Sequence, residues 1–202
     1  YNALQAVQLH PADYPNTVIV VIGESETRTL MNAYNPDHVP NTPWLTAMKS
    51  NPDFTLFTNA YSCVWYTVPV LEHVLHVMGS HIEYRNRYPK EFQKFNDGKI
   101  NQEADFDNTV LYTDWVLSQI YDYARDNLNL DAMIYFSDHG SDPDVARQPD
   151  SASFKVLRIP MFCYLSEGYQ KRNPDVVKAI KANKDKYFTN DLEYEFICGV
   201  LN

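Results

Sequence analysis

Short apolar runs that stop at a small-residue turn are the clearest pattern along this chain. The first, residues 17–22 (TVIVVI), is followed by GES, and the second, residues 132–137 (AMIYFS), is followed by DHG. Runs of this kind, apolar on both faces, are typical of buried strands in a parallel sheet. Functional groups in open α/β sheets lie just beyond the carboxyl ends of such strands. We therefore expect both runs to deliver the residues that follow them to one edge of a sheet.

The remaining periodicity completes an α/β pattern. Residues 54–61, 74–78 and 159–165 predict further strands. Apolar positions at helical spacing over 107–128 predict a long helix that covers a sheet face, and residues 189–201, which open with TND, predict another. Strands that alternate with helices predict an α/β fold with a mainly parallel central sheet and helices on both faces.

Composition narrows the class of protein. A chain of 202 residues fits one domain, residues 1–202, and its net charge of −9 argues against nucleic acid as the main partner. The sequence has no apolar run of the ~18–20 residues that a membrane span needs. The three cysteines lack CxxC spacing, which favours free thiols over a zinc knuckle.

Residues just after the two strands are candidate metal ligands. Glu24 follows the first strand, and the adjacent Asp138 and His139 follow the second. Carboxylate oxygens and an imidazole nitrogen are suitable ligands for one or two cations. The competing interpretations are a helix N-terminal acid for Glu24 and a surface loop pair for Asp138 and His139.

Hydroxyl and basic side chains supply further candidates. Ser62 and Thr67 are both possible alcohol nucleophiles, because metal coordination lowers the pKa of an alcohol. A helix cap or strand-edge position is the alternative for Thr67. His81 and Arg85, in a loop after a strand-like segment, form a plausible clamp for phosphate oxygens.

The ordered set of motifs resembles the phosphoethanolamine transferases of the sulfatase/alkaline-phosphatase superfamily. The matching stretches are VVIGESETR, NAYSCVWYTVPVLE, HVMGSHIEYRNRYP, FDNTVLYTDWVL, MIYFSDHGSD, RIPMFCYLS and YFTNDLEYEFICGVLN. This resemblance implies an alkaline-phosphatase/sulfatase-like fold and a zinc site made by Glu24, Thr67, Asp138 and His139. It also implies that Thr67 is the nucleophile that carries phosphoethanolamine, and that His81 binds substrate phosphate or a second zinc.

The same resemblance implies a cellular setting. Enzymes of this kind are held in the inner membrane by N-terminal helices, which this chain does not include, and their catalytic domain lies on the periplasmic side. They move phosphoethanolamine from phosphatidylethanolamine to lipid A or another cell-envelope glycan.

This sequence departs from the family pattern in three respects. The nucleophile segment runs almost directly into the GSH segment, so we expect a stretch of chain to be missing near residues 72–73. Residues 140–160 contain no further histidine, and Asp142, Asp144, Arg147 and Arg158 stand there instead. Three cysteines cannot reproduce the several disulfides of the better-known lipid A enzymes.

Other functions stay open at this level. A sulfatase is disfavoured, because Cys63 is not followed by the Pro and Arg of a C/S-x-P-x-R sequence. A phosphodiesterase or phosphoglycerol transferase would use the same nucleophile and metal. A non-catalytic envelope domain that kept the fold is the alternative of another class.

Overall fold

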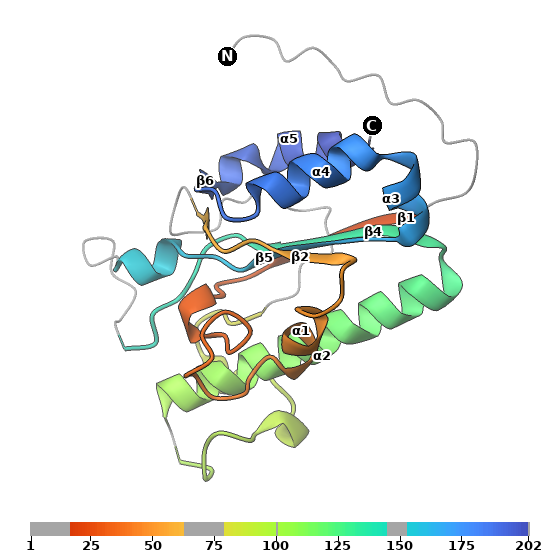
Figure 1. The fold of residues 1–202 in the computed structure, drawn as a ribbon. Coiled ribbons are helices and arrows are strands. Elements are labelled where there is room, and N and C mark those ends of the chain that lie inside the picture. Colours follow the sequence, from red (N-terminus) through yellow and green to blue (C-terminus); the bar gives the residue numbers. More distant parts are fainter. Residues whose placement is uncertain (1–16, 63–78, 100, 145–152, 202) are drawn as a thin grey trace.

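A four-stranded mixed sheet forms the centre of the protein. The computed structural model describes residues 17–62, 79–99, 101–144 and 153–201 (Figure 1). The strand order is β1-β4-β5-β2, and their bounds are β1 Thr17–Gly23, β4 Leu130–Ser137, β5 Met161–Leu165 and β2 Phe54–Leu56. β1 and β4 are parallel, whereas β4–β5 and β5–β2 are antiparallel.

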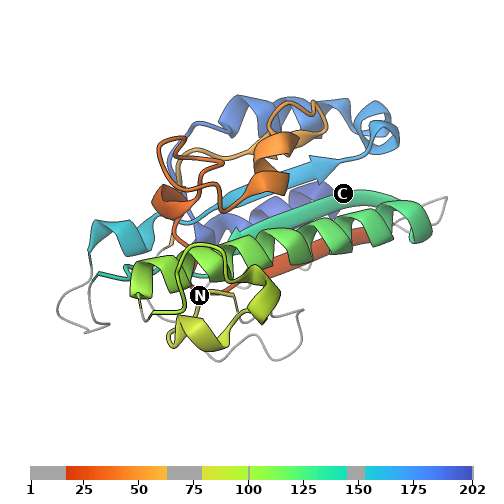
Figure 2. The same cartoon turned by 90° about the horizontal axis from the view of Figure 1, so that it is seen from below.

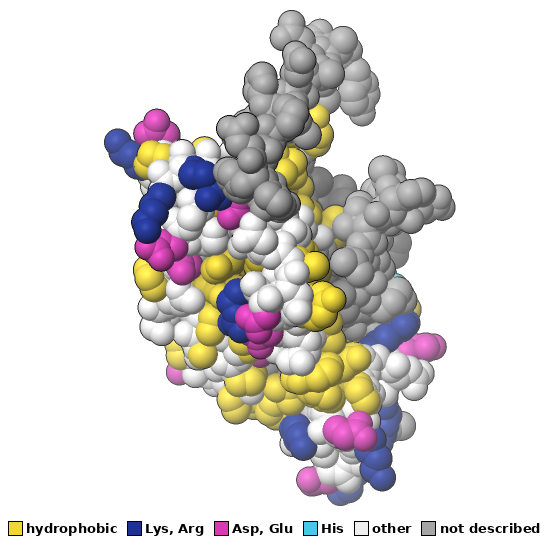
Figure 3. All heavy atoms as spheres, turned by 90° about the vertical axis from the view of Figure 1, so that its right-hand side faces the viewer, with side chains coloured by type: hydrophobic (Ala, Val, Ile, Leu, Met, Phe, Trp, Pro, Cys, Tyr) yellow, Lys and Arg dark blue, Asp and Glu magenta, His cyan; other side chains and the backbone are white. Residues whose placement is uncertain are grey.

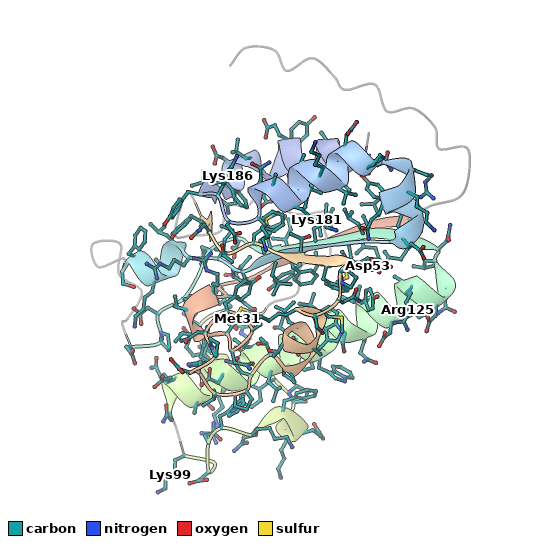
Figure 4. The ribbon with its side chains drawn as sticks, in the orientation of Figure 1. Met31, Asp53, Lys99, Arg125, Lys181 and Lys186 are labelled. Atoms are coloured by element: carbon teal, nitrogen blue, oxygen red, sulfur yellow. The ribbon has the colours of Figure 1, made fainter. Side chains whose placement is uncertain are left out.

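One face of this sheet is covered by α1 (Pro43–Met48) and α2 (Gln102–Asn127). α2 runs along the sheet beneath β4 (Figure 2). Its buried apolar residues pack with one side of the strands in a cluster that includes Val21, Met133, Tyr135, Phe162, Phe106, Val110 and Leu117. The side chain of Met31 lies in this layer, between sheet and helix (Figure 4). Asn101 caps α2, because its side chain accepts a hydrogen bond from the Ala104 amide at 3.1 Å.

The opposite face is covered by α4 (Pro174–Asn183) and α5 (Glu193–Leu201), with the short α3 (Glu167–Arg172) at one end (Figure 1). A second core cluster lies here and includes Ile22, Ile134, Phe136, Met161, Cys163, Ile180 and Val200. Both faces of β4 are therefore buried, which explains its uninterrupted apolar sequence. At the end of the molecule near α3, acidic and basic side chains are interspersed with apolar ones (Figure 3).

The α/β class, the central sheet and the helices on both faces are confirmed. The expectation of a mainly parallel sheet is wrong for the described strands, which contain one parallel pair and two antiparallel pairs. The reason is that a strand buried on both faces is apolar in either direction, so its pattern carries no information on pairing sense. The predicted strand at 74–78 lies outside the described residues.

Two segments are divided where one element was expected. Residues 54–61 leave the central sheet after β2, and β3 (Ala60–Tyr61) pairs in parallel with β6 (Phe188–Thr189) in a separate two-stranded sheet. Residues 189–201 form this strand end, the 3₁₀ turn η5 (Asn190–Leu192) and then α5. Further 3₁₀ turns are η1 (Arg28–Leu30), η2 (Tyr84–Asn86), η3 (Lys90–Phe92) and η4 (Phe154–Leu157).

Candidate metal centre

Glu24, Asp138 and His139 converge at the carboxyl ends of β1 and β4. The two strands are parallel and in register, with Gly23 opposite Ser137, so the residues that follow them emerge side by side. Each of the three side chains offers one ligand atom, and these atoms lie within 4.8 Å of one another. Glu24 is 2% exposed and His139 is fully buried, so the interpretations of a helix-end acid and a surface loop histidine are wrong.

The distances within this triad fit a shared cation. Nε2 of His139 lies 3.4 Å from Oε1 of Glu24 and 3.4 Å from Oδ2 of Asp138. Tetrahedral zinc with bonds of ~2.0–2.2 Å holds neighbouring ligand atoms about 3.4 Å apart. Two buried carboxylates that approach one imidazole at this spacing form a donor set suited to zinc.

Neighbouring groups orient the ligand atoms. Nδ1 of His139 lies 2.8 Å from the Gly140 carbonyl, which selects the tautomer with a proton on Nδ1 and turns the Nε2 lone pair toward the carboxylates. Oδ1 of Asp138 accepts from the amides of Ser25 at 3.0 Å and His139 at 2.8 Å, which directs Oδ2 toward the imidazole. Ser25, at φ 61°, also donates from its hydroxyl to Oε1 of Glu24 at 2.5 Å.

The GSH segment packs directly against Glu24. Gly79 has φ +30°, and a Cβ placed there would lie 2.6 Å from the Glu24 carbonyl oxygen, so this approach requires glycine. The next amide, that of Ser80, donates to the same carbonyl at 2.9 Å. His81 follows Ser80 in the chain, and its role at the substrate stays a prediction.

A second support holds the main chain of Asp138. Its carbonyl accepts from the Ser62 hydroxyl at 2.6 Å and from the Asn190 side-chain amide at 2.8 Å. Ser62, considered as a nucleophile, therefore uses its hydroxyl to position Asp138. The sequence analysis missed Asn190, because TND had the composition of a helix cap and gave no sign of a contact with a distant strand.

The remaining predicted site residues are not brought to this triad by any described contact. Thr67 lies outside the described residues, and its roles as ligand and nucleophile stay predictions. Arg85 is exposed, and its guanidinium donates to the Gly98 carbonyl at 2.6 Å. Asp142, which stands near the place of the absent histidine, accepts from Ser153 at 2.7 Å.

Burial shifts the pKa values of two ionisable side chains that follow Glu24. Glu26 is fully buried, and desolvation raises the pKa of its carboxyl from 4.5 to about 8, against the lowering effect of Thr113 and Tyr135. Burial lowers the pKa of the Arg28 guanidinium. The segment after β1 thus carries ionisable side chains away from solvent, as is common beside functional sites.

Sequence comparison places this chain in a family. The Sulfatase family model matches residues 73–195, more than half of the chain, and the match includes His81, Asp138 and His139. The chain belongs to the sulfatase family.

Proteins similar to this chain include phosphoethanolamine transferases. Phosphoethanolamine transferase EptC of Escherichia coli K12 is 31% identical over 120 residues, which cover 50% of this chain and 21% of that protein. The chain thus spans about a fifth of the length of the curated relatives it matches.

Two solved structures share the fold. The zinc complex of the C-terminal periplasmic domain of E. coli EptC has a TM-score of 0.73 at 20% identity, over 96% of this chain and 82% of that one. The integral membrane protein lipooligosaccharide phosphoethanolamine transferase A of Neisseria meningitidis has a TM-score of 0.79 at 16% identity, over 96% and 56%. Among the described residues of this chain, no helix is long and apolar enough to cross a membrane.

Proposed function

We propose that this chain is the catalytic part of a zinc-dependent phosphoethanolamine transferase. It moves phosphoethanolamine from phosphatidylethanolamine to lipid A or another cell-envelope glycan, on the periplasmic side of the inner membrane. The observation that carries the proposal is the 3.4 Å spacing of His139 Nε2 from both Glu24 and Asp138. The named relatives and the zinc complex of a protein with the same fold support it.

Different residues of the chain hold the metal and orient its ligands. Zinc, when bound, supplies positive charge that lowers the pKa of an alcohol and offsets negative charge growing on phosphoryl oxygens. Glu24, Asp138 and His139 would hold it, and Ser25, Ser62 and Asn190 keep these ligands oriented.

The transfer occurs in two steps at Thr67. Its hydroxyl loses a proton and bonds to the donor phosphorus, while the bond from phosphorus to diacylglycerol breaks and the departing oxygen gains a proton. An acceptor hydroxyl then loses its proton and bonds to the same phosphorus, while the bond from phosphorus to the Thr67 oxygen breaks and that oxygen regains a proton. His81, with Arg85 as the less supported partner, would bind the phosphoryl oxygens during both steps.

Intact-mass measurement tests the first step. Incubation with phosphatidylethanolamine in detergent micelles and no acceptor should add the mass of one phosphoethanolamine group to the protein. Peptide sequencing should place the group on Thr67. A chelator should prevent the gain, and added Zn²⁺ should restore it.

Variants separate transfer from folding. Thr67→Ala should abolish the mass gain, whereas Thr58→Ala should retain it, because Thr58 is exposed and its hydroxyl bonds to Asp185. A group found on Ser62, or full loading of Thr67→Ala, would overturn the assignment. If the wild-type protein binds no zinc and does not react with phosphatidylethanolamine, the result would instead support a non-catalytic domain.

A further inference from the structure

The main chains of two arginines, Arg28 and Arg158, meet near the segments that follow the metal-ligand candidates. Arg28 is in η1, four residues after Glu24, and Arg158 follows η4, three residues before β5 begins at Met161. The Arg28 amide donates to the Arg158 carbonyl at 2.9 Å, and Tyr61 forms an isolated bridge with Arg158. η1 and η4 accordingly lie at the same end of the sheet in Figure 1.

Contacts join this pair to the residues that follow the zinc ligands. The Gly140 amide donates to the Val156 carbonyl at 2.7 Å, two residues before Arg158. The Ser141 amide donates to the Thr27 hydroxyl at 2.6 Å, one residue before Arg28. A Cβ at Gly140 would lie 2.9 Å from the Val156 carbonyl oxygen, so this close approach of the two segments requires glycine.

Neither arginine has an acidic partner among the described residues. Arg28 is 7% exposed, yet its Nη1 is buried without a hydrogen-bond partner there, and Nε of Arg158 is in the same condition. The nearby Asp142 and Asp144 face Lys155 instead, at 3.7 and 3.8 Å. The two guanidinium groups repel one another, and burying them without an acidic partner among the described residues is costly.

Aromatic rings hold the two guanidinium groups without neutralising them. Arg28 Cζ lies 5.5 Å from the centre of the Tyr61 ring, and Arg158 Cζ lies 5.1 Å from that of Phe154. The two rings are themselves 5.6 Å apart. A cation–π contact fixes the plane of an arginine and leaves its N–H groups available to an anion. The Ser141 hydroxyl, also buried without a partner in the described chain, adds a further donor to this neighbourhood.

We propose that Arg28 and Arg158 bind a phosphate group carried by the acceptor, in a subsite separate from the metal centre. This inference rests on the proposed function and narrows it to phosphorylated acceptors. Phosphatidylethanolamine carries a single phosphate, which must lie at the metal centre to react. A second anion at the arginine pair must therefore come from the other substrate. Planar guanidinium groups with paired N–H donors suit phosphate oxygens.

Binding of inorganic phosphate tests the subsite without any turnover. Titration calorimetry on chelator-treated protein should detect phosphate binding that Arg158→Gln weakens by about 10- to 100-fold, the effect of losing charge-assisted hydrogen bonds. Arg125→Gln is the matched control, because Arg125 is paired with Asp122 and Asp126 and lies at the opposite end of the sheet (Figure 4). Arg158→Lys keeps the charge and should show an intermediate affinity, and circular dichroism of each variant checks its fold.

Three results would overturn the subsite. The first is equal binding of phosphate by Arg158→Gln and wild type. The second is no phosphate binding by either wild type or Arg158→Lys. The third is loss of phosphate binding in Glu24→Gln. The last result would place the anion at the zinc ligands.

Steady-state kinetics of the transfer reaction tests whether the bound phosphate belongs to the acceptor. Arg158→Gln should lower kcat/KM about 10-fold or more for a phosphorylated glycolipid acceptor relative to the same acceptor after phosphatase treatment. An equal loss for both acceptors, or a larger loss in donor loading measured as mass gain, would refute the acceptor role. Absence of all transfer by wild-type protein would defeat the proposed function, whereas the phosphate titration would still decide whether the arginine pair binds anions.

Discussion

His139 Nε2 lies 3.4 Å from Glu24 Oε1, although the two residues follow different strands. Their approach depends on the parallel pairing of β1 and β4, which sets Gly23 opposite Ser137. Because the carboxylate and the imidazole are both buried, a bound cation would offset the cost of keeping the Glu24 charge away from water.

Loss of one ligand should therefore remove the metal but keep the fold. We expect Glu24→Gln to reduce bound zinc, measured by elemental analysis, from about one ion per chain to a small fraction of that. Zn²⁺ should raise the Tm of chelator-treated wild type, because it binds the folded state, and should leave the Tm of the variant unchanged. Glu167→Gln is the control, since Glu167 is exposed and pairs with Lys171. Equal zinc content in Glu24→Gln would contradict the site.

Asn190 should affect metal affinity without contributing a ligand. Its amide donates to the Asp138 carbonyl at 2.8 Å, and an Asp at this position could not donate when ionised. We expect Asn190→Asp to weaken zinc binding by roughly 10- to 100-fold, the usual effect of a lost supporting contact. Asn183→Asp provides the comparison, because Asn183 is exposed and its amide likewise donates to a main-chain carbonyl, that of Ala179. Similar zinc affinities in both variants would show that Asn190 does not position Asp138.

Two glycines should respond in opposite directions to a Cβ. Gly79→Ala places a methyl group 2.6 Å from the Glu24 carbonyl oxygen at φ +30°, so it should destabilise the protein and weaken zinc binding. Gly199 in α5 has no atom within 4 Å of its Cβ position, so Gly199→Ala should stabilise the protein by ~0.5–1 kcal/mol. Urea unfolding and a zinc titration of both variants check the pair. A Gly79→Ala protein with wild-type stability would mean that the segment does not pack on Glu24 as described.

The sequence was most informative where residue type and strand end coincide. The apolar runs before Glu24 and Asp138 identified two strands, and the rule that α/β sites lie at strand ends predicted that their ligands meet. The pattern could not show that β5 and β2 run antiparallel to β4, because burial on both faces gives the same composition in either direction.

Sequence patterns could not predict contacts between segments that are distant in the chain. Asn190 had the spacing of a helix cap, and only the tertiary structure brings its amide to Asp138. Arg28 and Arg158 are far apart in the chain, and nothing in the sequence indicates that they meet. They stand out because the fold buries their nitrogen atoms with no acidic partner among the described residues.

Glu193 provides a prediction about stability and pH. It is 4% exposed at the start of α5, and neither carboxylate oxygen has a hydrogen-bond partner among the described residues. Burial raises the pKa of its carboxyl from 4.5 to about 8. Because the folded-state pKa is the higher one, the folded protein binds the proton more tightly than the unfolded chain. The free energy of unfolding is therefore highest below pH 4.5 as far as this group is concerned, and falls as pH rises toward 8.

Replacement of Glu193 by Gln should flatten this dependence. A neutral amide has no charge to bury at pH 8, so Glu193→Gln should be more stable than wild type at pH 8, on the order of 2–4 kcal/mol, and closer to it at pH 5. Part of the slope should remain, because burial also raises the pKa of Glu26 to about 8 and of Asp114 to about 7. Urea unfolding at both pH values, with chelator present to exclude metal binding, measures the effect, and the exposed Glu195→Gln serves as control. A variant with the same loss of stability from pH 5 to pH 8 as wild type would show that folding does not raise the pKa of the Glu193 carboxyl.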